Sequence, residues 1–209
     1  MSLTTEVYQK LKNEILHAVR GPGDVLYEAD IAKSFGVSKT PVRESLLLLT
    51  EAGWIITLPR KGYIVRPVEL RDVRDIFAFR QMIEPRLAGR ATSLATERQK
   101  EELLGLVKMQ ASGELGRGLI AAREFHLNLA SIAGSPRATA TLTDLVDEVL
   151  RLHYLLPMGE EHITSAEELR AHEDILAAIC AGDSDKAEIL MSSHLAEVAQ
   201  TLVKGFTGT

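Results

Sequence analysis

The chain has 209 residues and a formal net charge of −5, and 45% of its residues are hydrophobic. This length predicts one or two domains with packed cores. No apolar run is long enough to span a bilayer, so we expect no membrane partner. Cys180 is the only cysteine and has no partner for an internal disulfide, which favours the reducing cytoplasm as the compartment.

The charges are unevenly distributed along the chain. Residues 1–67 contain nine Lys and Arg against seven Asp and Glu, whereas residues 68–209 contain 15 against 22. An acidic segment repels nucleic acid, so only the N-terminal region is suited to bind DNA. We therefore predict two domains, over residues 1–67 and 68–209.

Two short helices joined by a tight turn are predicted after a first helix over residues 4–19. The segment 28–35 has its apolar side chains at helical spacing, and Gly36 permits a turn with positive φ. Ser38 is a favourable cap for the next helix, in whose first turn Pro41 costs no hydrogen bond. These features indicate a helix-turn-helix.

The second helix of this pair has two faces of different chemistry. One arc is apolar or small and can pack inward, and it contains Val42, Ser45, Leu46 and Leu49. The other arc contains Lys39, Thr40 and Arg43. Arg can bind a guanine edge in the major groove through two hydrogen bonds, and Lys and Thr can reach bases or phosphates. We predict that Ser38, Lys39, Thr40 and Arg43 contact DNA.

A hairpin follows this helix. Residues 54–58 and 63–65 are rich in β-forming side chains and flank a turn that contains Pro and Gly. Its tip is basic, so Lys61 and Gly62 are expected to approach a phosphate or the minor groove. The alternative is a small helical domain with merely solvated basic residues. The order of turn, capped helix and basic hairpin favours a winged helix-turn-helix.

These segments also resemble a known family. The runs GVSKTPVRESL, EAGWI and PRKGYIV are similar to the DNA-binding signature of the GntR family of bacterial transcription regulators, over about residues 5–67. The chain departs at Leu47 and Leu48, where that family commonly has basic residues, and its loop after the first helix is shortened. Each lost phosphate contact should lower the slope of the salt dependence by about one unit.

The rest of the chain is patterned as helices separated by caps and glycines. Six helices with short connections form a bundle. The predicted helices cover residues 70–94, 97–112, 117–133, 136–156, 164–181 and 184–204. The predicted fold class is therefore mostly α, with an N-terminal winged helix-turn-helix carrying a small β-hairpin wing and a C-terminal all-α bundle.

Three histidines lie in separate predicted helices of the bundle, each with apolar neighbours at helical spacing: His126, His172 and His194. Such imidazoles can converge on one cavity and bind a divalent ion through neutral nitrogens. From spacing alone, the alternative is that each is a hydrogen-bonded core residue. His153 is a further candidate to border the cavity. We expect no Asp or Glu beside the three histidines to act as a general base.

The runs REFHLNLASIAGS, LRAHEDILAAICAGD and MSSHLAEV are similar to the FCD effector domain of the FadR-type GntR subfamily. That resemblance implies a divalent metal, zinc or nickel, on His126, His172 and His194. It also implies an Asp or Asn one helical turn before the first histidine, where this chain has Ala122. Three histidines with water or ligand oxygens can still hold a metal at an open site.

Arg80 and Glu84, in FAFRQMIEPRLAGRA, match an R…E pattern of the same family. The resemblance implies that Arg80 lines the pocket and binds an effector carboxylate in a two-pronged salt bridge. The alternative is a structural Arg–Glu pair one turn apart on a helix, and Glu84 is expected to be structural.

We therefore predict a cytoplasmic homodimeric transcription regulator, not an enzyme, that places two helices in successive major grooves of a near-palindromic operator on double-stranded DNA. A small anionic metabolite, a carboxylic acid that ligates the metal, is expected to bind the bundle and release a repressor from DNA. Two alternatives are a metal-sensing repressor, in which the ion is the signal, and a metal-dependent hydrolase that uses a bound water.

Overall fold

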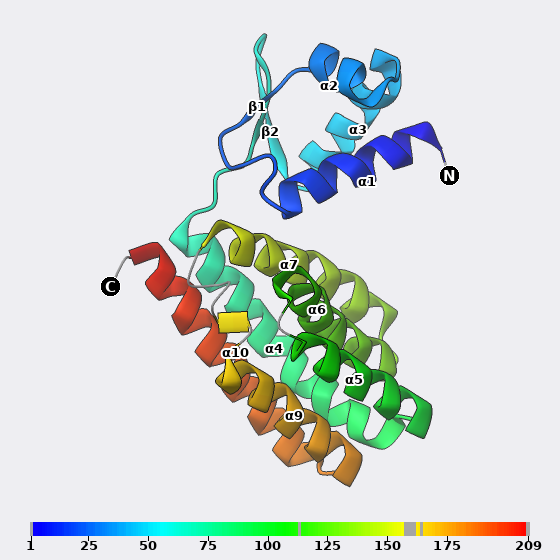
Figure 1. The fold of residues 1–209 in the computed structure, drawn as a ribbon, viewed down its shortest axis with the longest axis vertical. Helices are drawn as coiled ribbons and strands as arrows, with labels where there is room; N and C mark the ends of the chain where they lie inside the picture. Colours follow the sequence, from blue (N-terminus) through cyan, green and yellow to red (C-terminus); the bar gives the residue numbers. More distant parts are fainter. Residues whose placement is uncertain (1, 113, 157–161, 164, 208–209) are drawn as a thin grey trace. The chain divides into compact units, whose positions relative to one another are not determined.

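The computed structural model describes residues 2–112, 114–156, 162–163 and 165–207. The chain divides into two compact units, Met1–Glu69 and Leu70–Thr209. Figure 1 shows helices throughout both units and one small sheet in the first. The predicted fold class, mostly α with a winged helix-turn-helix before a helical bundle, is confirmed.

The first unit contains three helices, α1 (Leu3–Leu16), α2 (Glu28–Phe35) and α3 (Lys39–Glu51). Gly36 has a φ of 67° between α2 and α3, so the predicted turn is confirmed. Helix α1 ends three residues earlier than predicted, because Ala18 adopts a positive φ of 53°.

The prediction that Ser38 caps α3 is only partly right. Ser38 has the extended backbone of an N-cap residue, but its side chain makes no capping hydrogen bond. The first turn of α3 therefore begins without a hydroxyl acceptor from its own cap residue.

The wing is a three-stranded antiparallel sheet in the order β1-β3-β2, formed by β1 (Val25–Leu26), β2 (Ile55–Leu58) and β3 (Gly62–Val65). The predicted hairpin is present as β2 and β3, and Thr57 pairs with Tyr63 in it. Strand β1 was not predicted; it has only two residues and pairs with the other edge of β3.

One apolar core holds the first unit together. Side chains from α1, α2, α3 and the sheet meet in it, and their burial drives the packing. Its fully enclosed members include Leu11, Ile31, Val42, Leu46, Leu49, Ile55 and Val65. The polar arc of α3 is left on the outside.

The second unit is the predicted bundle. Helices α4 and α10 pack along each other, α6 packs against α4, α5 and α7, and α9 packs against α4, α5 and α10 (Figure 1). Its helices are α4 (Leu70–Leu94), α5 (Glu97–Gln110), α6 (Leu115–Ile132), α7 (Pro136–Leu155), α9 (Ala166–Ala181) and α10 (Ser184–Thr207).

Side-chain caps fix several of these helix starts. Thr96 caps α5 in a capping box with Gln99, and Ser135 and Ser165 accept a backbone N–H at the starts of α7 and α9. The helix predicted from residue 164 begins at Ala166, and residue 164 itself lies outside the described residues. Among the described residues, no helix has the length and apolar character that crossing a membrane requires.

Candidate functional site

The residues predicted to contact DNA lie at the N-terminal end of α3 and at the tip of the wing. Ser38, Lys39, Thr40 and Arg43 are exposed, whereas the apolar arc of the same helix is buried. Lys61 is exposed as well. Because the buried arc fixes the helix, the exposed arc is presented on a rigid support.

Gly62 has a structural reason to be glycine. Its φ is 94°, and a Cβ at this position would lie 2.6 Å from the carbonyl oxygen of Leu26. Only glycine avoids both the positive-φ penalty and this contact with β1. The geometry of the wing itself therefore requires glycine at this position, independently of any contact with DNA.

Arg43 has a partner that the sequence analysis missed. Its Nε and terminal nitrogen donate to the two carboxylate oxygens of Glu28 on α2, at 3.0 and 2.8 Å. The hydrogen bond from Arg43 lowers the pKa of the Glu28 carboxyl and raises the pKa of Arg43 itself. Arg43 remains 61% exposed, so the pair orients its side chain without burying it.

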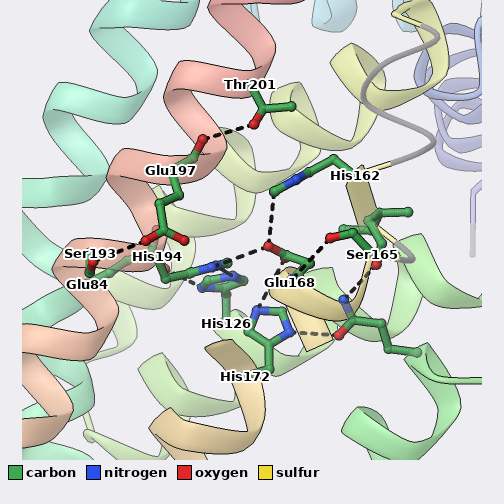
Figure 2. Close-up of polar contacts among 12 residues, drawn as sticks. Glu84, His126, His162, Ser165, Glu168, His172, Ser193, His194, Glu197 and Thr201 are labelled. Atoms are coloured by element: carbon green, nitrogen blue, oxygen red, sulfur yellow. Dashed lines mark hydrogen bonds and ion pairs between the residues drawn. The ribbon is translucent and has the colours of Figure 1, made fainter. Parts of the chain in front are cut away.

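Figure 2 shows the second cluster of polar side chains, inside the bundle. His126 comes from α6, His172 from α9 and His194 from α10, and all three are buried. One nitrogen from each ring lies within 4.8 Å of the others. Histidines 46 and 22 residues apart in the sequence thus meet in one place.

Two of the three rings are oriented by a polar side chain on another helix. His126 Nδ1 donates to Glu84 Oε2 on α4 at 2.6 Å, and His172 Nδ1 donates to Gln110 Oε1 on α5 at 2.7 Å. The amide nitrogen of Gln110 donates in turn to the carbonyl oxygen of Ile163. Such acceptors fix the tautomer and leave the Nε2 lone pair available.

Two of the Nε2 atoms in the cluster lie next to each other, and the third has no hydrogen bond within the described residues. His126 Nε2 lies 3.3 Å from His194 Nε2, and the buried His172 Nε2 has no hydrogen-bond partner among the described residues. Burial lowers the pKa of His172 well below its ordinary value and that of His194 to about 4. Both rings are therefore neutral near pH 7, which is the form that binds metal ions.

A carboxylate stands beside the histidines, contrary to the sequence-based expectation. Glu168 Oε1 lies 3.7 Å from His172 Nε2, and Oε2 lies 3.4 Å from His194 Nδ1 and 3.2 Å from His162 Nε2. Burial opposes the charge of Glu168, but His194, His162 and His172 outweigh it and lower its pKa. The sequence contained an indication of this contact, because Glu168 and His172 are four residues apart and residues with this spacing lie on the same face of a helix.

Arg80 and Glu84 form a buried pair on α4. Arg80 Nε donates to Glu84 Oε1, while the other oxygen of Glu84 accepts from His126. Burial opposes the charge of Glu84, but Arg80 and His126 outweigh it and lower its pKa to about 2. Glu84 thus connects the cationic side chain to the histidine cluster.

A small cavity of about 30 Å³ adjoins the cluster, which is room for an ion or one to two water molecules. Arg80, His126, His153, Glu168 and His194 line it together with apolar side chains, so His153 borders the cavity as expected. Ala122 also lines it, one turn before His126, where a longer side chain would point inward.

The donor set suits a borderline divalent ion such as zinc or nickel. Neutral imidazole nitrogens are favoured ligands of both ions. In a tetrahedral site with metal–nitrogen bonds near 2.0–2.1 Å, neighbouring donors are about 3.3 Å apart. His126 Nε2 and His194 Nε2 have this separation, and His172 Nε2, which has no hydrogen-bond partner among the described residues, would be the third donor.

Models of two protein families match this chain. The model of bacterial regulatory proteins of the gntR family matches residues 3–65, and that of the FCD domain matches residues 75–197. The HTH-type transcriptional repressor RspR of Escherichia coli (strain K12) is 32% identical over 202 residues, covering 94% of this chain and 87% of that protein. The HTH-type transcriptional regulator LutR of Bacillus subtilis (strain 168) is 27% identical over 204 residues, covering 87% and 92%.

Solved structures share the fold. E. coli McbR/YncC superposes with a TM-score of 0.85 at 22% sequence identity, covering 99% of both chains. A putative GntR transcriptional regulator from Rhodococcus sp. RHA1 gives a TM-score of 0.82 at 23% identity, covering 97% of this chain and 98% of that one. At these identities the likeness concerns the fold alone.

Proposed function

This chain belongs to the GntR family of bacterial regulatory proteins and is a transcription regulator with an FCD effector domain rather than an enzyme, and from this premise we propose that a small carboxylate bound at a divalent metal controls its affinity for DNA. Residues 1–67 bind DNA in this proposal, and residues 68–209 bind the effector and form a homodimer. The protein acts in the cytoplasm.

The DNA-binding part of the proposal rests on the exposed arc of α3. Lys39, Thr40 and Arg43 enter a major groove, with Ser38 at the helix start, and Arg43 reads a base edge through its two-pronged geometry. The exposed Lys61 and the neighbouring Gly62 bring the wing to the phosphate backbone. The Glu28 carboxylate, which holds Arg43 in the free protein, is exchanged for the base.

A test replaces Arg43 by Ala. Selection from random duplexes with the wild-type protein first identifies the operator. Arg43→Ala should then lower operator affinity roughly 5- to 150-fold without lowering affinity for random DNA to the same extent. Arg98→Ala, which removes an exposed positive charge from α5, is the control and should change neither. Unaltered operator preference in Arg43→Ala would overturn this role of α3.

The homodimer rests on apolar side chains exposed on α4 and α10, which pack along each other. Met82 is 70% exposed and Ile189 is 68% exposed, beside an open groove that both line. A second copy is the proposed occupant, because a near-palindromic operator is read by two helices related by a twofold axis. Sedimentation should show a dimer that Met82→Glu and Ile189→Glu convert to a monomer; a monomeric wild type would contradict it.

The effector site rests on one observation above all, the meeting of His126, His172 and His194 with two Nδ1 atoms occupied and two Nε2 atoms next to each other. We assign the Nε2 atoms of His126, His172 and His194 as ligands of the metal. The bound ion supplies a Lewis-acidic position for an anionic oxygen. Arg80 lines the same cavity and binds the carboxylate beside the metal.

The sign of regulation in this proposal is repression relieved by the ligand. The related RspR is named a repressor. A ligand releases DNA only if it binds more tightly to a conformation that the operator disfavours, and DNA then weakens ligand binding by the same factor.

A second candidate function is a metal-sensing repressor, which the size of the cavity favours. About 30 Å³ accommodates an ion more readily than an organic acid. Two series of measurements distinguish these two functions. Operator affinity is measured first at a fixed zinc concentration with varied organic acids, and then at varied zinc concentrations without acid. A response to acid supports the metabolite regulator, and a response to zinc alone supports the sensor. No response to either would refute both.

A further inference from the structure

We propose that Glu168 is the fourth protein ligand of the metal, so that its carboxylate reaches the ion from α9. This inference rests on the proposed three-histidine site and adds a ligand to it. The resulting donor set is three imidazole nitrogens and one carboxylate oxygen. Zinc and nickel are both bound by combinations of these donors in proteins.

The first support is the position of the two carboxylate oxygens. Oε1 lies 3.7 Å from His172 Nε2, which forms no hydrogen bond within the part of the chain that the structure describes, and Oε2 lies 3.4 Å from His194 Nδ1. The Oε1–Nε2 separation is slightly longer than the distance of about 3.3 Å between neighbouring ligands of a tetrahedral zinc. Our proposal requires the Glu168 side chain to move Oε1 towards the histidine nitrogens when the ion binds. Figure 2 shows Glu168 between the rings of His162 and His172.

The second support is that the local sequence alone does not explain this orientation. Glu168 is the third residue of α9, and its backbone N–H donates to the cap residue Ser165. Gln99 has the same place in α5, and its side chain turns back to the amide of Thr96 in a capping box. At α9 the amide of Ser165 donates to the carbonyl oxygen of His162 instead, and the Glu168 side chain extends into the bundle.

The third support is electrostatic. Glu168 is 4% exposed, and a buried carboxylate is costly unless a cation or several hydrogen bonds compensate its charge. His162 lies 3.2 Å from one oxygen of this carboxylate, and the nearby rings of His172 and His194 are neutral near pH 7. A divalent ion at the cluster would add the further positive charge that a buried carboxylate requires. Ala122 offers no oxygen from α6, and the other carboxylate at the cluster, Glu84, is already engaged by Arg80 and His126.

A different role for Glu168 is to accept a hydrogen bond from His194 Nδ1, as Glu84 does for His126. Under that role neither oxygen would touch the ion. The crystal structure of the zinc-loaded full-length protein, with the ion located by its anomalous signal, distinguishes the two roles directly. We expect an oxygen of Glu168 at about 2.0–2.2 Å from zinc; a separation beyond about 3 Å would overturn the inference.

A competition titration with a zinc chelator tests the same point in solution. Glu168→Gln has nearly the same shape as the wild type and should weaken zinc binding roughly 10- to 100-fold or more. Glu167→Gln is the matched control, since the neighbouring Glu167 lies in the same helical turn and is exposed. Adding Ala122→Asp to Glu168→Gln should restore affinity, because it returns a carboxylate to the cavity from α6. Unchanged affinity in Glu168→Gln would contradict the proposal.

Failure of the underlying metal site gives a different result. If the wild-type protein binds no zinc, and His172→Ala therefore changes nothing, the three-histidine site is wrong and Glu168 loses its role with it. If His172→Ala abolishes zinc binding but Glu168→Gln does not alter it, the metal site stands and only the fourth ligand is refuted. Circular dichroism of each variant establishes that it is folded.

Discussion

The buried pair of Arg80 and Glu84 gives a sharp prediction, because α4 and α10 also provide an exposed pair for comparison. Arg80 and Glu84 are 3% and 2% exposed, whereas Arg86 and Glu188 are 79% and 23% exposed. Replacing Glu84 by Gln removes the charge that compensates Arg80 and keeps the shape of the side chain. Replacing Glu188 by Gln does the same at the surface.

The expected magnitudes differ clearly. Removing one partner of a buried ion pair typically costs about 3–5 kcal/mol, whereas an exposed pair contributes about 0–1 kcal/mol. The pKa of Glu84 supports the lower end of the first range. It is lowered from 4.5 to about 2, a shift that corresponds to about 3 kcal/mol of stabilisation of the charged form.

Urea unfolding with two probes measures this difference within one protein. Trp54 is the only tryptophan and lies in the core of the first unit, so its fluorescence reports that unit. Far-UV circular dichroism is dominated by the larger helical unit that contains Glu84. We expect Glu84→Gln to lower the midpoint of the dichroism transition without moving the fluorescence transition.

The control and a double variant complete the test. Glu188→Gln should move neither transition by an amount equivalent to more than about 1 kcal/mol. Replacing Arg80 by Met together with Glu84 by Leu should recover much of the lost stability, because no uncompensated charge remains. A loss below about 1 kcal/mol in Glu84→Gln would refute the reasoning, since the pair would then contribute no more than an exposed one.

Three further predictions concern acid stability, the wing and Arg43, the arginine that we propose contacts DNA. Burial lowers the pKa of His153 to about 4. The contribution of the neutral ring to folding stability is therefore complete above the ordinary pKa of 6.5 and is lost as the pH falls from 6.5 towards 4. His153→Gln should flatten the dependence of the unfolding free energy on pH over this range in metal-free protein. Gly62→Ala should destabilise the first unit by roughly 1–3 kcal/mol, measured by tryptophan fluorescence, because of its positive φ and the carbonyl of Leu26. Glu28→Gln should raise affinity for random DNA in filter binding at low salt, because it frees Arg43 and removes a negative charge; unchanged affinity would mean that Glu28 does not hold Arg43 back from DNA.

The helices were largely predictable because their ends are marked locally. Thr96 and Ser135 act as caps through their own side chains, and Gly134 and Gly182 have positive φ where helices stop. The end of α1 was not predictable in this way, since it depends on Ala18, a residue that seldom adopts positive φ. Strand β1 was missed because two residues are too few to establish an alternating pattern.

The site was predictable where its residue types are rare or where its residues match the pattern of the FCD domain, as Arg80 and Glu84 do. Histidine in an apolar helical context is unusual, so His126, His172 and His194 stood out from the sequence. Glutamate in the first turn of a helix is common and suits the helix dipole, so Glu168 did not. Gln110 and Glu28 were missed for a related reason, because their partners come from other elements and only packing brings them together.

Glu84 suggests how the proposed metal site can be coupled to the rest of the chain. Its helix, α4, is continuous from Leu70, the first residue of the second unit, to Leu94. Glu84 lies 14 residues after Leu70, or about 21 Å along a helix. A ligand that shifts His126 must either break its 2.6 Å hydrogen bond to Glu84 or move α4 with it. Breaking the bond costs about 1–3 kcal/mol, because one oxygen of the buried Glu84 loses its hydrogen-bond donor while Arg80 still pairs with the other. Moving α4 avoids this cost, and α4 is joined directly by the chain to the first unit.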